Sequence, residues 1–233
     1  MIKNKINHNS LSEIAYKKIK VLILNNVLKP GEKIVQEKMA MSLGISKIPL
    51  IQSLTRLSNE GLLVKIQRKG FCVREFSSEE INNIFEIREA LESLSVSKLL
   101  KERSPKVVKK VKEFLKDFEY YYKNNDFKNY YDTDVKFHYF LIKSSKNTLL
   151  YDIFDKFNLL LIGYIKGFVL ELGESYNQHK DLINAIIEND CGKALMFINK
   201  HVEAVREKMN STGQAGTTRD SLNDFKMFED PKG

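Results

Sequence analysis

Hydrophobic residues recur every three or four positions along most of the chain, which predicts a mainly α-helical protein. In the first third, this spacing predicts a helix from Ser10, its N-cap, to about Asn26, and a second helix over Val35–Leu43. A third helix follows Ser46 and ends at Glu60 and Gly61. Two short β-prone segments, 62–66 and 71–73, then predict a hairpin.

The junctions between these elements indicate how they are connected. Gly44 lies just past the last apolar position of the second helix, where a left-handed residue ends a helix at least cost. Ser46 offers an N-cap oxygen to the third helix. The predicted hairpin has a basic tip that could reach phosphates, formed by Gln67, Arg68, Lys69 and Gly70. This order predicts a winged helix-turn-helix domain over residues 8–76, with the helix-turn-helix at about 36–55.

The pattern changes at Ser78, and no convincing strand follows Val73. A Ser-Ser-Glu-Glu sequence is typical of a helix N-terminus, and helical apolar spacing follows it. Breakers and spacing predict five further helices: about Pro105–Lys123, Phe127–Lys143, Asn147–Leu172, Glu174–Glu188 and Cys191–Met209, with Gly173 separating the third from the fourth. We therefore expect an all-α antiparallel bundle over residues 78–210. The segment 211–233 has no periodicity and is predicted to be a disordered tail.

Charge separates the same two regions. Residues 1–76 contain 14 Lys and Arg against 5 Asp and Glu, a net charge of +9, whereas residues 77–233 contain 24 and 25, a net charge of −1. A basic head on a neutral domain is the charge distribution expected of a DNA-binding protein with a separate sensing or assembly domain.

Composition excludes several other classes. The apolar content of 42% and charged content of 29% are typical of a globular protein, and no run of eighteen apolar residues is present. The segment 1–10 lacks the apolar core of a secretory signal, so we expect a cytoplasmic protein without membrane contact. Cys72 and Cys191 are far apart, which argues against a disulfide framework or a thiolate metal site.

The head also carries the residues of a known family. They are Leu28, Pro30, Gly31, Glu32, Leu43-Gly44-Ile45-Ser46-Lys47, Pro49, Leu54, Leu57, Glu60-Gly61-Leu62 and Gly70. This pattern resembles the DNA-binding domain of the GntR family. The sequence departs from it at Lys47, where the family usually has arginine, and at Ile51 and Gln52, where it usually has arginine and glutamate.

We expect the head to bind double-stranded DNA mainly through phosphate contacts. Residues expected to supply charge are Lys47, Arg56, Arg68 and Lys69. Residues expected to fix the register are Ser46, Gln52 and Gly70. Ile48 and Ile51 suit apolar contact with thymine methyl groups, which predicts an A·T-rich site.

Four metal-binding side chains are predicted to point into the bundle. Asp134 and His138 are four residues apart and share one helix face, while His179 and His201 each lie on an apolar stripe. The last two are each eleven residues from Asp190, so an antiparallel helix pair would place both rings at the same height. One divalent ion per subunit would satisfy all four groups, and their N and O ligands suit Zn, Ni, Mn or Fe. The alternative is that each histidine is a hydrogen-bonded core residue.

The bundle resembles the all-helical sensing (FCD) domain of the FadR-type branch of the GntR family. Metal-binding members of that branch carry Asp-x-x-x-His and two later histidines, which the four residues above match. The resemblance implies a small carboxylate effector held near the ion. Arg88 lies where family members have an arginine that approaches the ligand; the alternative is a surface arginine paired with Glu92, four residues further on.

These features predict a homodimeric transcriptional regulator that binds an inverted-repeat operator and is not an enzyme. One alternative is a metal-independent regulator that binds an acyl thioester, which the aromatic helix 127–143 leaves open. A helical metalloenzyme is less favoured, because the sequence contains no Glu-x-x-His pair, His-Glu-x-x-His, glycine-rich phosphate loop or Gly-x-Ser-x-Gly.

Overall fold

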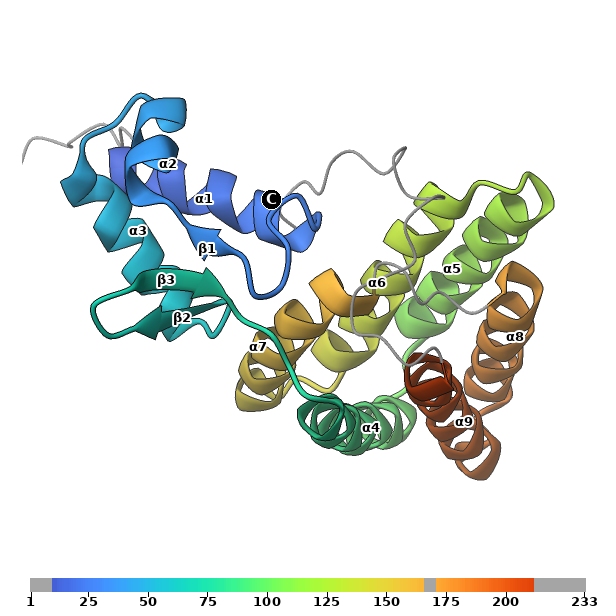
Figure 1. Ribbon diagram of the computed structural model, residues 1–233. Helices are drawn as coiled ribbons and strands as arrows, with labels where there is room; N and C mark the ends of the chain where they lie inside the picture. The colour runs from blue at the N-terminus through green and yellow to red at the C-terminus, as the bar shows by residue number, and fades with distance from the viewer. Residues whose placement is uncertain (1–9, 166–170, 212–233) are drawn as a thin grey trace, which may run out of the picture. The chain divides into compact units, whose positions relative to one another are not determined.

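The computed structural model describes residues 10–165 and 171–211, with the backbone alone for 158–165 and 211. Within these ranges the chain forms two units that divide after Glu75 (Figure 1). The last helix extends to Ser211. The rest of the predicted tail, and the segment 1–9, lie outside the described residues.

The first unit is the predicted winged helix-turn-helix (Figure 1). Its elements are α1 (Leu11–Leu24), β1 (Lys33–Ile34), α2 (Gln36–Leu43), α3 (Lys47–Asn59), β2 (Leu63–Ile66) and β3 (Gly70–Val73). The three strands form an antiparallel sheet in the order β1-β3-β2, in which Ile34 pairs with Phe71 and Leu63 with Val73. Strand β1 was not predicted, since two residues are too few to show a periodic pattern.

The helix-turn-helix is fixed by one glycine and an apolar face. Gly44 has φ 65° and ψ 34°, the left-handed conformation predicted for the end of α2. Three leucines of α3, Leu50, Leu54 and Leu57, are 0% exposed, and α3 packs against α1. Ser46 is the N-cap residue of α3 as predicted, but its side chain makes no capping hydrogen bond.

The described residues of the second unit form the predicted helical bundle. Its helices are α4 (Ser78–Lys101), α5 (Pro105–Lys123), α6 (Phe127–Ser144), α7 (Thr148–Ile165), α8 (Leu172–Glu188) and α9 (Cys191–Ser211). The N-cap of α4 is Ser77, which forms a capping box with Glu80. Gly173 was wrongly predicted to be a separator: it lies in the first turn of α8, where backbone N–H groups are unpaired in any helix and a glycine interrupts little.

The bundle packs around one aromatic and aliphatic core. α4 packs against α6, α7 and α9, and α8 packs against α5 and α9. Phe118, Tyr130 and Phe137 lie in this core, with exposed fractions of 0–1%, so these aromatic residues of α5 and α6 are structural. α8 and α9 form a hairpin in which Asn189 is left-handed with φ 62° and Asp190 accepts a hydrogen bond from the backbone of Lys193.

Among the helices of the described residues, none combines the length and the apolar character that crossing a bilayer requires.

Packing within the first unit can be tested by one matched pair of substitutions. Leu54→Ala should lower the free energy of unfolding of this unit by about 2–5 kcal/mol, because the removed side chain is fully buried. Leu11→Ala makes the same change at a side chain that is 56% exposed and should cost below about 1 kcal/mol. Hydrogen exchange of the full-length protein, followed by mass spectrometry on peptides of α3, measures both. Equal losses would contradict the packing.

Candidate functional site

Four side chains from three helices of the second unit meet in its interior. Asp134 and His138 come from α6, His179 from α8 and His201 from α9. One potential ligand atom from each lies within 4.8 Å of all the others. The three histidines are buried, whereas the Asp134 side chain retains 22% exposure. The structure thus brings together all four predicted metal ligands and leaves their carboxylate side accessible to solvent.

The imidazoles turn the same ring nitrogen toward the centre of the cluster. His138 Nε2 is 3.3 Å from His201 Nε2, and His179 Nε2 is 3.0 Å from Asp134 Oδ1. His138 Nε2 is 3.7 Å from the same carboxylate oxygen. The His179 and His201 rings have centroids 4.5 Å apart, which confirms that the α8–α9 hairpin places them at one height.

Each imidazole binds an outer partner through its other nitrogen. Nδ1 of His138 is 2.6 Å from a Glu92 carboxylate oxygen, and Nδ1 of His201 is 2.9 Å from the Gln178 amide oxygen. Nδ1 of His179 is 3.1 Å from the Tyr130 hydroxyl. When Nδ1–H donates to such a partner, the tautomer is fixed with the Nε2 lone pair facing inward. Outer-shell partners of this kind orient metal-binding histidines in proteins.

One buried nitrogen of the cluster has no hydrogen-bond partner among the described residues. His179 Nε2 is the only buried side-chain nitrogen or oxygen without a hydrogen bond among the described residues. Its 3.0 Å approach to Asp134 Oδ1 does not have hydrogen-bond geometry. A buried polar atom without a partner costs about 1–3 kcal/mol. An orphaned Nε2 beside two further Nε2 atoms and a carboxylate fits a divalent cation, so the four residues could hold a metal.

The charges of the cluster depend on burial and on the neighbouring residues. Burial by itself raises the pKa of Asp134, but His138 and His179 hold it well below its usual range. Burial opposes a charge on His138, yet Glu92 and Asp134 raise its pKa to about 9. Burial and the neighbouring imidazoles lower the pKa of His201 well below its usual range. Asp134 is therefore ionised and His201 neutral, the states that metal ligands require, whereas a metal at this cluster would displace a proton from His138.

The structure places Arg88 in the interior, next to this cluster. Arg88 is 8% exposed, and its Nε donates to Glu92 Oε1 at 2.5 Å. Pairing with Glu92 was one of the two sequence interpretations, but the surface position that it assumed is wrong. Burial opposes ionisation of Glu92, but Arg88 and His138 together lower its pKa to about 2, so the carboxylate is charged.

The sequence interpretation did not include the outer partners in the site. They are Glu92, Gln178, Tyr130 and Ser175. Two of them had a usable signal: Tyr130 is four residues before Asp134, and Ser175 is four before His179, so each shares a helix face with a predicted ligand. Gln178 and Glu92 lie near the cluster only because α8 and α4 pack there, and sequence spacing does not show this.

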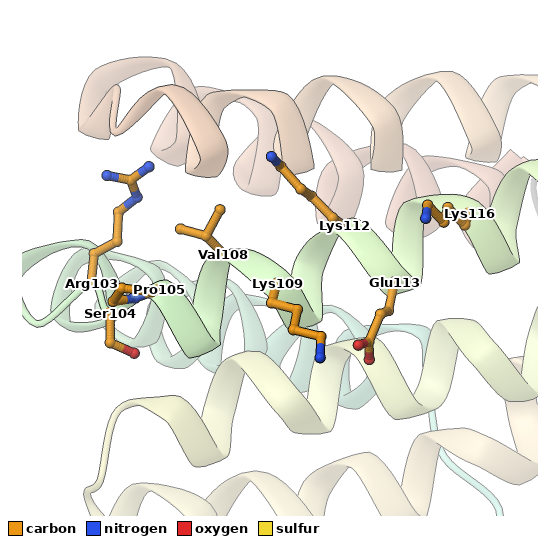
Figure 2. A pocket seen from close by; sticks show the side chains of 8 residues that line it. All are labelled: Arg103, Ser104, Pro105, Val108, Lys109, Lys112, Glu113 and Lys116. Carbon is orange, nitrogen blue, oxygen red and sulfur yellow. The ribbon is translucent and has the colours of Figure 1, made fainter.

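A separate surface hollow of about 640 Å³ lies at the start of α5 (Figure 2). Its lining residues are Arg103, Ser104, Pro105, Val108, Lys109, Lys112, Glu113 and Lys116. The lining includes four cationic side chains, and Glu113 pairs with Lys110 at 3.0 Å. This hollow contains none of the four cluster residues, so it is separate from the candidate metal site.

The predicted DNA contacts are exposed on the first unit. Those at the start of α3 and along it are Ser46, Lys47, Ile48, Ile51, Gln52 and Arg56. Arg68 and Lys69 are exposed at the turn between β2 and β3. Gly70 follows with φ 92°, a conformation that favours glycine. α3 packs against β2, so the helix is in direct contact with one strand of the wing.

Two of these cations have intramolecular carboxylate partners. Lys47 Nζ is 3.0 Å from Glu37, and Arg56 pairs with Glu13 at 2.6 Å and with Glu60 at 3.4 Å. The Arg56 guanidinium also lies 3.7 Å from the centre of the Tyr16 ring. Arg56 therefore helps to join α3 to α1 whether or not it reaches a phosphate.

Known proteins share both units. The FCD domain model matches residues 83–204, and the model for bacterial regulatory proteins of the gntR family matches residues 11–73. The HTH-type transcriptional regulator YdhC of Bacillus subtilis (strain 168) is 28% identical over 151 residues, which cover 63% of this chain and 66% of that relative. The gluconate operon transcriptional repressor of the same organism is 21% identical over 204 residues, 84% of this chain and 83% of the repressor.

A solved structure has the same overall fold as this chain. The structure of E. coli McbR/YncC covers 88% of this chain and 99% of its own, with a TM-score of 0.72 and 18% sequence identity. At that identity the similarity supports the architecture alone.

A winged helix-turn-helix followed by an FCD bundle defines a class of bacterial transcription regulators. This chain belongs to the GntR family, in its FadR-like branch with a C-terminal FCD domain. It is a DNA-binding transcriptional regulator and not an enzyme, as predicted, and the relatives named above are regulators too.

Proposed function

We propose that this protein is a homodimeric, metal-dependent regulator whose response to a small carboxylate changes its affinity for an inverted-repeat operator. Its action on DNA implies that it works in the cytoplasm. The observation that carries the proposal is the convergence of three Nε2 atoms and Asp134 Oδ1 inside the FCD domain, with one of those nitrogens unpaired.

The metal ligands are Asp134, His138, His179 and His201, one ion per subunit. Their N and O donors suit Zn, Ni, Mn or Fe. When bound, the ion supplies a positive centre that can accept a carboxylate oxygen. The three histidines are buried, which limits the access of water to them, whereas the Asp134 side chain keeps 22% exposure and offers the side from which a ligand could enter.

Arg88 is the residue proposed to recognise the carboxylate. Its Nε is used by Glu92, while its two terminal nitrogens have no hydrogen bond to the described residues. The Arg88 side chain keeps 9% exposure. A guanidinium whose two terminal nitrogens lie side by side suits a carboxylate.

The chemistry of one relative agrees with this class of ligand. The repressor of the gluconate operon is named for a small hydroxy acid. We extend to this chain only the chemical class, a small organic acid. An effector of this class alters DNA binding only if it binds one arrangement of the dimer better than another.

The acyl-thioester alternative fits the structure less well. Such a ligand needs a large apolar cavity. Phe118, Tyr130 and Phe137 fill the core of the described bundle, and the hollow on α5 is lined largely by lysine and arginine.

Metal binding is tested first by removing two ligands. The His179→Ala, His201→Ala double variant should lose the ion that the wild-type protein retains, because two of four donors are absent. Plasma emission spectrometry on protein purified without a tag or chelator measures the content. Glu113→Ala, which removes a carboxylate from the α5 hollow, should keep the ion. A double variant with stoichiometric metal would show that these histidines are core residues.

DNA binding is tested by separating charge from base recognition. Arg68→Ala with Lys69→Ala should weaken binding to all sequences, and each phosphate interaction that is removed should reduce the slope of log K against log salt by about 1. Ile48→Ala with Ile51→Ala should change which A·T-rich half-sites are enriched and leave the slope unchanged. Selection from random duplexes and salt titrations measure the two effects.

The DNA proposal has a clear contrary result. Binding that is insensitive to salt, or a selection that yields no enriched half-site, would argue against sequence-specific recognition by this head.

Dimerisation is expected because two heads related by a two-fold axis match an inverted repeat. Light scattering of the full-length protein should give twice the chain mass of 27.1 kDa. A monomer mass at micromolar concentration, with or without metal, would remove this part of the proposal.

A further inference from the structure

Glu92 occupies an unusual place between the two proposed binding groups. Its carboxylate is 0% exposed, and each of its oxygens binds a different partner. Oε1 accepts from Arg88 Nε at 2.5 Å, and Oε2 is 2.6 Å from His138 Nδ1. One buried side chain therefore contacts both the arginine proposed to bind the effector and a proposed metal ligand.

We propose that Glu92 is a positioning residue that couples metal binding to carboxylate binding. The inference rests on the proposed function, because it presumes an ion at the cluster and a carboxylate at Arg88. Glu92 does not touch either ligand in this scheme. It acts by fixing the side chains that do.

The first half of the argument concerns His138. A carboxylate only accepts hydrogen bonds, so Nδ1 of His138 carries a proton toward Glu92. Its Nε2 then faces His201 Nε2 and Asp134, the direction of the other ligands. Without Glu92 the ring has no hydrogen bond that selects both its tautomer and its orientation.

The second half concerns Arg88. Its Nε donates to Glu92, which orients the planar guanidinium and leaves the two terminal nitrogens for another acceptor. A metal-binding His138 is neutral, so Arg88 faces the carboxylates of Glu92 and Asp134 without a second positive charge from this ring. A divalent cation bound at the cluster adds positive charge beside Arg88, and a carboxylate bound there offsets it. Each ligand should therefore favour the other, and the coupling is reciprocal.

An amide cannot replace this carboxylate in both roles. In Glu92→Gln one atom can still accept a hydrogen bond, but the NH2 group faces a second donor, either Arg88 Nε–H or His138 Nδ1–H. The variant keeps the volume of the side chain and breaks one of its two hydrogen bonds. It is therefore a sharper test than removal of the side chain.

The chain offers a matched control at Gln178. Its amide oxygen is 2.9 Å from His201 Nδ1, so it supports one metal ligand as Glu92 supports another. Its side-chain amide donates to Glu174 on the same helix, and it has no hydrogen bond to Arg88 within the described part of the chain. Gln178→Ala should lower the affinity for the metal, and a carboxylate should still strengthen metal binding in this variant.

The experiment measures the affinity of the full-length protein for Ni²⁺, by competition with a chromogenic chelator, with and without saturating acetate as the carboxylate probe. Acetate should tighten Ni²⁺ binding to the wild type by about 5-fold or more. Glu92→Gln should weaken Ni²⁺ binding about 10–100-fold and abolish the acetate effect. Arg88→Met should change the affinity for Ni²⁺ alone by less than that and also abolish the acetate effect.

Two further readouts separate positioning from damage to the fold. The visible spectrum of bound Co²⁺ should change in Glu92→Gln, because the orientation of one ligand changes, and remain that of the wild type in Arg88→Met. Circular dichroism melting of each variant without metal checks that the bundle is folded. A variant that melts below the assay temperature is replaced by Glu92→Asp, whose shorter arm can reach only one of the two partners.

The possible results separate failure of the proposed role of Glu92 from failure of the proposed function. A wild-type protein that binds no Ni²⁺ overturns the proposed function and the inference together. Normal metal binding by Glu92→Gln overturns the inference alone. Normal coupling in Glu92→Gln shows that Glu92 does not couple the two sites, and no effect of acetate on the wild type shows that they are not coupled at all; either result overturns the inference.

Discussion

The second unit depends on a constraint of solvation: three imidazoles and two carboxylates lie in or beside a core of phenylalanine, leucine and isoleucine. Groups of this kind are costly to bury without partners. Glu92, Gln178 and Tyr130 provide hydrogen-bond partners for the outer nitrogens, Nδ1, of the three histidines. One inner nitrogen, His179 Nε2, has no hydrogen bond among the described residues, which fits a candidate metal site better than an ordinary core.

The first unit has the opposite requirement, because DNA binding needs polar and charged groups that stay exposed on its surface. Its leucines pack α3 onto α1 and leave the opposite face of α3 to solvent. The ion pair of Lys47 with Glu37 is exposed, and exposed pairs contribute little to stability, so the lysine can exchange its partner at small cost. Arg56 is more constrained, because Glu13, Glu60 and Tyr16 all hold it. The head therefore combines a fixed frame with exchangeable surface charges.

Periodicity alone was sufficient for the helices, because an apolar stripe that repeats every three or four residues has one stable solution, burial against another element. The same regularity predicted that Asp134, His138, His179 and His201 would share the interior of the bundle. Periodicity did not predict strand β1, because its two residues are too few to show a repeating pattern. It also failed at Gly173, because a local breaker signal does not show whether the residue stands outside a helix or in its first turn.

The sequence by itself thus determined the class of protein, the winged head, the helical bundle and the four residues that meet in its interior, since these depend on spacing along one helix or on symmetry about one turn. Only the tertiary structure decided what surrounds that set. Glu92 lies 46 residues before His138 in the chain, and its contact with that ring exists because α4 packs against α6. The burial of Arg88 has the same origin. A partner across two helices is selected by packing, and no local pattern encodes it.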